Sequence, residues 1–267
     1  TPWLHEPVEI LGETVLELDI SADKPVAMVA VRLIDVQPDD SETRVTYGLL
    51  NLTHRDSNGQ PEPLEPGKRY KVRVPLKHVA QRFPAGHCIR VAISSTYWPI
   101  AWPSPEPARL TVYTGTSRLI LPVRDPRPED EAVRDWGTPR GGPPLAKTLI
   151  APRQESWRVI KDLANDKVML EVVNDDGRER LDDIGMEIGG RVEERYSYVG
   201  NTYESIRGET LWERTFSRGD WQVRTVTWTL MTSDATHFRI QATLDAYEGE
   251  SRIHSKTWDV AIPRDLV

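Results

Sequence analysis

The chain has almost no cysteine. Its 267 residues contain a single thiol, Cys88, so no disulfide can form within the chain. Cys88 opens a segment in which apolar residues alternate with small or charged ones, a pattern that predicts a buried, unreactive thiol on a strand. The sequence therefore excludes a disulfide-stapled scaffold and nominates no cysteine nucleophile.

Long apolar runs and a positive charge balance are missing as well. No apolar stretch approaches the roughly 18 residues that a membrane-spanning helix needs. The formal net charge is −7, and neither half of the chain is basic. Binding to phosphates or to anionic lipid requires clustered positive charge. We therefore expect no nucleic-acid partner and no membrane association.

Catalytic motifs are absent too. The chain contains no G-x-S-x-G elbow, and its six histidines show no H-E-x-x-H or Cys/His ligand spacing. A triad built from His54 or His87 with Asp56 and a serine is formally possible, but no elbow or oxyanion hole supports it. We predict no catalytic residue, no metal site and no cofactor in this chain.

The first part of the chain is rich in short, β-branched segments separated by turn residues. A single helical turn around His78 to Gln81 is also possible. Many short strands without long helices predict an all-β fold, with residues 1–125 forming a jelly-roll-like antiparallel β-sandwich of the galactose-binding type. The strands are expected at residues 14–20, 26–36, 43–52, 69–76, 87–95, 109–114 and 118–123.

Residues 126–147 are rich in proline, glycine and charge, which predicts a linker. Residues 148–267 then resume long alternating segments and predict a second antiparallel β region. Hairpin turns are expected at 174–177 and 217–220, where glycine follows polar residues. Four tryptophans suggest that one face of this sheet is heavily aromatic: Trp212, Trp221, Trp228 and Trp258.

The segment after the 87–95 strand combines large rings with prolines. Tyr97, Trp98 and Trp102 are interleaved with prolines, which forbid helix and place the rings on an irregular rim. Three interpretations remain open: docking on another domain with a contribution to its substrate cleft, an independent carbohydrate-binding module, or a cover over one open end of the sandwich. His87, at the head of the strand, either aims at a partner domain or hydrogen-bonds within its own turn.

Several stretches resemble a known family when taken in order. They are EPVEILGETVLELDISADKPVAMVAVRLIDVQPD, PLEPGKRYKVRVPL and PAGHCIRVAISS, and together they span roughly residues 3 to 123. The segment resembles the C-terminal domain of the X-Pro dipeptidyl-peptidases and cocaine-esterase-like acyl hydrolases. Such enzymes carry a Ser-His-Asp triad on an α/β-hydrolase domain that precedes this one.

The resemblance implies a role without chemistry of its own. We expect a non-catalytic C-terminal fragment of a serine hydrolase that braces the catalytic domain and shapes its cleft through Tyr97, Trp98, Trp102 and His87. The catalytic domain is the expected partner, self-association is possible, and a cytoplasmic location is expected. A stand-alone carbohydrate-binding module is the alternative.

Overall fold

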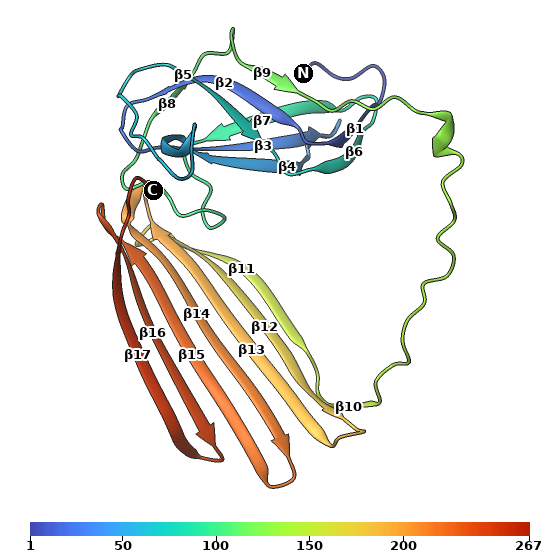
Figure 1. Ribbon diagram of the computed structural model, residues 1–267, viewed down its shortest axis with the longest axis vertical. Helices are drawn as coiled ribbons and strands as arrows, with labels where there is room; N and C mark the ends of the chain where they lie inside the picture. Colours follow the sequence, from blue (N-terminus) through green and yellow to red (C-terminus); the bar gives the residue numbers. More distant parts are fainter. The chain divides into compact units, whose positions relative to one another are not determined.

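The computed structural model describes residues 1–267, which form two compact units. One contains Thr1–Trp136 together with Leu266–Val267, and the other contains Gly137–Asp265 (Figure 1). Nearly all regular structure is β-strand, and the exceptions are two short 3-10 turns, η1 (Leu52–His54) and η2 (Pro128–Asp130). The predicted all-β fold class is confirmed. No helix has the length and apolar character needed to cross a membrane.

The first unit is an antiparallel sandwich. One sheet has the order β5-β2-β8, with β9 also paired to β2, and the other has the order β4-β3-β7; β1 and β6 form a separate pair. The strands are β1 (Val8–Gly12), β2 (Val15–Ala22), β3 (Met28–Val36), β4 (Glu42–Asn51), β5 (Tyr70–Pro75), β6 (Val79–Phe83), β7 (Cys88–Ser94), β8 (Leu110–Val112) and β9 (Arg118–Ile120).

The core of this unit follows from strand alternation. On β3, Val29, Val31 and Leu33 are fully buried in the central apolar cluster, where they meet inward side chains of β2 such as Leu18. Successive side chains of a strand point to opposite faces. Arg32, which lies between Val31 and Leu33, therefore belongs to the outer face of the β4–β3–β7 sheet.

One local expectation is wrong. The segment around His78 to Gln81 is not a helical turn but the start of β6, which pairs antiparallel with β1 so that Val8 faces Phe83. Val79, Gln81 and Phe83 alternate as a strand requires, and Phe83 is completely buried. Burial of that ring outweighs the weak local tendency to turn.

The second unit is a single antiparallel meander. Its strands follow the order β10-β12-β13-β14-β15-β16-β17, with β11 pairing beside β10 on β12. They are β10 (Lys147–Ala151), β11 (Gln154–Asp162), β12 (Lys167–Leu181), β13 (Met186–Val199), β14 (Thr202–Arg218), β15 (Trp221–Ser233), β16 (His237–Glu248) and β17 (Ser251–Pro263).

The hairpin expected at residues 174–177 is wrong. β12 runs through this segment, and the register with β13 shifts between Asp175 and Arg178, which marks a bulge. Gly177 takes a φ of 69° there, and its N–H donates to the Asp175 carboxylate at 2.9 Å. The polar, glycine-containing sequence signals a left-handed residue, which a bulge needs as much as a hairpin does.

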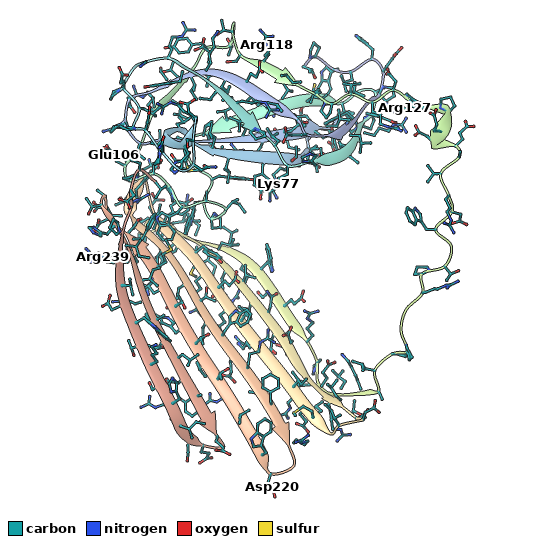
Figure 2. All side chains as sticks on the ribbon, in the orientation of Figure 1. Lys77, Glu106, Arg118, Arg127, Asp220 and Arg239 are labelled. Carbon is teal, nitrogen blue, oxygen red and sulfur yellow. The ribbon has the colours of Figure 1, made fainter.

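The other hairpin is confirmed. β14 ends at Arg218 and β15 begins at Trp221, with Gly219 at a φ of 57° in the turn. Figure 2 shows Asp220 at the tip of this hairpin. The aromatic-face expectation is right only in part, because Trp228 pairs with Leu211 and so lies on the face opposite Trp212.

Candidate docking surface around the aromatic loop

The aromatic loop, residues 95–109, joins β7 to β8 and carries three of the four candidate site residues. Its far end is fixed, because the Arg109 N–H donates to the Asp23 carboxylate at 2.7 Å. Lys24 forms an ion pair with Glu106 at 2.6 Å. The rings are thus presented on a segment that is tied to the sandwich.

Tyr97 packs on the outer face of the β4–β3–β7 sheet. Its ring meets Tyr47 edge to face, with centroids 5.6 Å apart, and its hydroxyl accepts a hydrogen bond from Arg44. The Arg32 guanidinium lies 5.0 Å from the Tyr97 centroid. Lys77, labelled in Figure 2, places its ammonium 4.6 Å from the Tyr47 centroid. We call these five residues the cation–aromatic cluster.

The cation–aromatic cluster is positive. Arg32, Arg44 and Lys77 form no ion pair with a carboxylate, and their charges are held against tyrosine rings instead. Each such contact is worth about 0.5–1 kcal/mol at an exposed site. The surface therefore offers aromatic area together with unneutralised positive charge, a combination that suits an acidic, partly apolar protein surface.

Trp98 and Trp102 form a second aromatic feature in the same loop. Their ring centroids lie 5.0 Å apart with an interplanar angle of 88°, the edge-to-face geometry that aromatic pairs prefer. Both rings are half-buried, and Ile100 between them is 49% exposed. Perpendicular rings do not form one flat platform for a sugar, whereas they fill an irregular apolar groove well.

His87 lies apart from the aromatic loop. It precedes β7 and the loop follows β7, so the strand separates them by roughly 20 Å. Its Nδ1 atom is 2.8 Å from the Asp35 carboxylate, and its carbonyl accepts from the Leu4 N–H at 2.8 Å. These bonds hold the N-terminal segment, β3 and β7 together.

The residues of the formal triad do not assemble. His54 Nδ1 lies 2.9 Å from the Thr53 hydroxyl, while His87 is bonded to Asp35 and not to Asp56. No group of three or more His, Cys, Asp and Glu side chains is placed to hold a metal ion.

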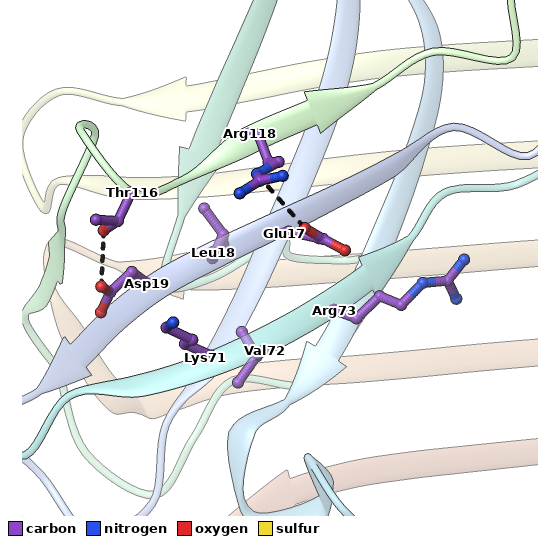
Figure 3. A pocket seen from close by; sticks show the side chains of 8 residues that line it. All are labelled: Glu17, Leu18, Asp19, Lys71, Val72, Arg73, Thr116 and Arg118. Carbon is purple, nitrogen blue, oxygen red and sulfur yellow. Dashed lines mark hydrogen bonds and ion pairs between the residues drawn. The ribbon is translucent and has the colours of Figure 1, made fainter.

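A shallow polar groove of about 280 Å³ lies on the outer face of the other sheet (Figure 3). Its two carboxylates are both paired: Asp19 accepts from Thr116 at 2.7 Å and forms an ion pair with Arg69, which lies outside the groove lining, and Glu17 lies 3.8 Å from Arg118. The bonds from Arg69 and then Thr116 hold the pKa of Asp19 below its ordinary value. The groove is lined by Glu17, Leu18, Asp19, Lys71, Val72, Arg73, Thr116 and Arg118.

The sequence alone missed the cation–aromatic cluster. Its members come from β3, β4, the segment after β5 and the aromatic loop, so only the fold brings them together. One signal was available: Arg32 is the one charged residue among the apolar residues 28–34, and a long charged side chain there is expected to point outward from the sandwich.

Comparisons with known proteins match part of the chain. Residues 1–133 match the family model described as X-Pro dipeptidyl-peptidase C-terminal non-catalytic domain. Cocaine esterase from Rhodococcus sp. (strain MB1 Bresler) is 28% identical over 99 residues, which are 37% of this chain and 17% of that protein. The family resemblance seen in the sequence is confirmed.

Two solved structures also align with part of the chain. An alpha-amino acid ester hydrolase is 25% identical with a TM-score of 0.44, over 46% of this chain and 25% of that one. An aminopeptidase from the marine sediment archaeon Thaumarchaeota archaeon is 23% identical with a TM-score of 0.44, over 47% and 25% of the two chains. The chain spans a quarter or less of the length of each of these relatives.

Proposed function

We propose, from the match of residues 1–133 to the family model of the X-Pro dipeptidyl-peptidase C-terminal non-catalytic domain, that the chain is the non-catalytic C-terminal region of a larger serine hydrolase. The parent enzyme is of the α/β-hydrolase type and acts as an acyl esterase or an X-Pro dipeptidyl-peptidase. The family match is the observation that carries the proposal. The absence of a G-x-S-x-G elbow from these residues supports it, because the nucleophile then lies in another part of the enzyme.

The role of the chain is to brace the catalytic domain and to shape the rim of its substrate cleft. Tyr97, Trp98 and Trp102 form the docking surface, because large rings bury much area with little loss of side-chain entropy. The cation–aromatic cluster favours an acidic patch on the catalytic domain. For His87 we propose a supporting role, since its bond to Asp35 fixes the start of β7.

Activity assays test this assignment. The 267-residue chain and the parent enzyme are incubated with p-nitrophenyl acyl esters and with an X-Pro p-nitroanilide. We expect turnover by the parent, loss of that turnover when the serine of its elbow is replaced by alanine, and no turnover by the chain above a heat-unfolded control. Turnover by the chain alone that disappears on a single serine substitution contradicts the proposal.

A glycan-binding measurement separates docking from the carbohydrate-binding alternative. Tryptophan fluorescence of the chain is titrated with a panel of oligosaccharides. We expect no saturable change, because the perpendicular Trp98–Trp102 pair does not form a flat stacking surface. Saturable binding that is lost in the Trp98→Ala/Trp102→Ala variant replaces the docking proposal with a sugar-binding one.

A further inference from the structure

The sheet of the second unit has two faces of opposite character. β16 shows this most clearly: Ile240, Ala242 and Leu244 alternate with Gln241 and Thr243 along the strand. Because paired residues of neighbouring strands share a face, the register extends this division across the sheet. Trp258 on β17 pairs with Ala242 and therefore lies on the apolar side.

We call the apolar side of this sheet the apolar face and define it by Trp157, Val159, Val192, Trp212, Ile240 and Trp258. Its large rings are accessible: Trp157 is 73% exposed, Trp212 is 41% exposed and Trp258 is 36% exposed. All regular structure of the second unit belongs to this one sheet, so the unit has no second layer of its own over the apolar face.

The opposite side of the sheet carries charged and polar side chains. Glu171 forms ion pairs with Arg158 and Arg195, and Arg195 forms a further ion pair with Glu193 at 2.7 Å. Trp228, on this side, donates its indole N–H to Glu209 at 2.7 Å. A network of ion pairs and polar contacts is typical of the solvent-exposed face of an antiparallel sheet that packs on one side only.

We propose that the apolar face is the interface between two copies of this chain, which pack face to face as a β-sandwich. The sheet is seven strands wide, and its strands average about 12 residues. The usual spacing between strands and rise per residue then give the face an area of roughly 1,200 Å². A stable interface needs only about 800 Å² from each partner. Monomeric proteins rarely leave an apolar patch larger than a few hundred Å² in water.

The charges on the apolar face fit a second copy of the same surface. Glu194 accepts a hydrogen bond from the Tyr196 hydroxyl at 3.0 Å, and Arg214 donates to Asp176 at 3.2 Å. The Arg214 charge is therefore paired and the Glu194 carboxylate is hydrogen-bonded within each copy. Lys256, which pairs with Leu244 and so lies on the same face, holds its ammonium 4.9 Å from the Trp258 ring centroid. A two-fold contact joins identical patches, and two such faces meet without opposing a row of like charges.

The proposal is tested on the full 267-residue chain by sedimentation velocity over a range of concentrations. We expect a species of twice the 30.4 kDa chain mass. Trp212→Arg is expected to weaken dimerisation at least 100-fold, because it places a charge at the middle of the apolar face. Leu211→Arg is the matched control: Leu211 precedes Trp212 on β14 and is 37% exposed, but it lies on the polar side. This control is expected to remain dimeric.

If circular dichroism shows that Trp212→Arg does not fold, Trp258→Lys on the edge strand β17 serves as a second variant. A chain that is monomeric at all concentrations overturns the proposal. So does a dimer that survives the substitutions on the apolar face, which indicates pairing of sheet edges instead. Equal loss of dimer in the Leu211→Arg control overturns it as well.

Discussion

The imidazole of His87 and the carboxylate of Asp35 lie 2.8 Å apart and join the start of β7 to the end of β3. Asp35 is only 7% exposed, so His87→Ala leaves a buried carboxylate without its partner. We expect a loss of about 1–3 kcal/mol in unfolding free energy. Chemical denaturation measures it, with exposed His78→Ala as the control, for which a change within about 0.5 kcal/mol is expected. The structural role is contradicted if His87→Ala keeps full stability but binds the catalytic domain more weakly, because His87 then acts in docking.

Asp234 makes the β15–β16 hairpin sensitive to acid. Its pKa is held well below the ordinary value, first by the Thr236 N–H, then by the Thr236 hydroxyl, the His237 N–H and Arg239. A lowered folded-state pKa stabilises the protein above the unfolded pKa near 3.8, and this stabilisation is lost as the pH falls through the folded value.

We therefore expect Asp234→Asn to lower the unfolding free energy at pH 7 and to flatten its decline below about pH 4. Denaturant unfolding followed from pH 7 to pH 2 measures this dependence. Asp220→Asn, at the tip of the β14–β15 hairpin, is the control (Figure 2). An unchanged pH dependence in Asp234→Asn contradicts the assignment.

Two glycines with similar backbone angles should respond differently to alanine. A Cβ atom on Gly177 would lie 2.3 Å from the Ala151 carbonyl oxygen, whereas one on Gly219 meets nothing within 4 Å. Both have positive φ, 69° and 57°, so each substitution carries a conformational cost of about 1–2 kcal/mol. Only Gly177→Ala adds a backbone clash across the bulge. Thermal unfolding should show the larger loss for Gly177→Ala, and equal losses rule out crowding at the bulge.

The division of the chain at residues 126–147 remains a prediction that proteolysis can test. Exposed connections rich in proline and glycine lack protective hydrogen bonds and are cut first. Trypsin should cleave after Arg134 or Arg140 before it cleaves within either sheet, and mass spectrometry identifies the products. First cleavage at an arginine of β12 or β14 contradicts the assignment of 126–147 as the linker.

The sequence predicted what depends on local pattern. Alternation located most strands of the first unit, and β5 occupies Tyr70–Pro75 within the expected range 69–76. Prediction from the sequence failed where tertiary contacts determine the local structure. Burial of Phe83 favours a strand in its segment, and Gly177 lies in a bulge because β10 and β11 both pair with the long β12. The cation–aromatic cluster was unpredictable for the same reason, since its residues meet only after the sandwich forms.

The affinity of this chain for the separately produced catalytic domain, measured by isothermal titration calorimetry, tests the central claim most directly. We expect saturable binding that Trp98→Ala/Trp102→Ala weakens at least about 30-fold, because a docking hot spot contributes about 2 kcal/mol or more. Trp3→Ala, which removes a ring that is 48% exposed outside the aromatic loop, should leave the affinity unchanged. Undiminished binding by the folded double variant contradicts the account, and so does a double variant that no longer folds, because the rings then belong to the core.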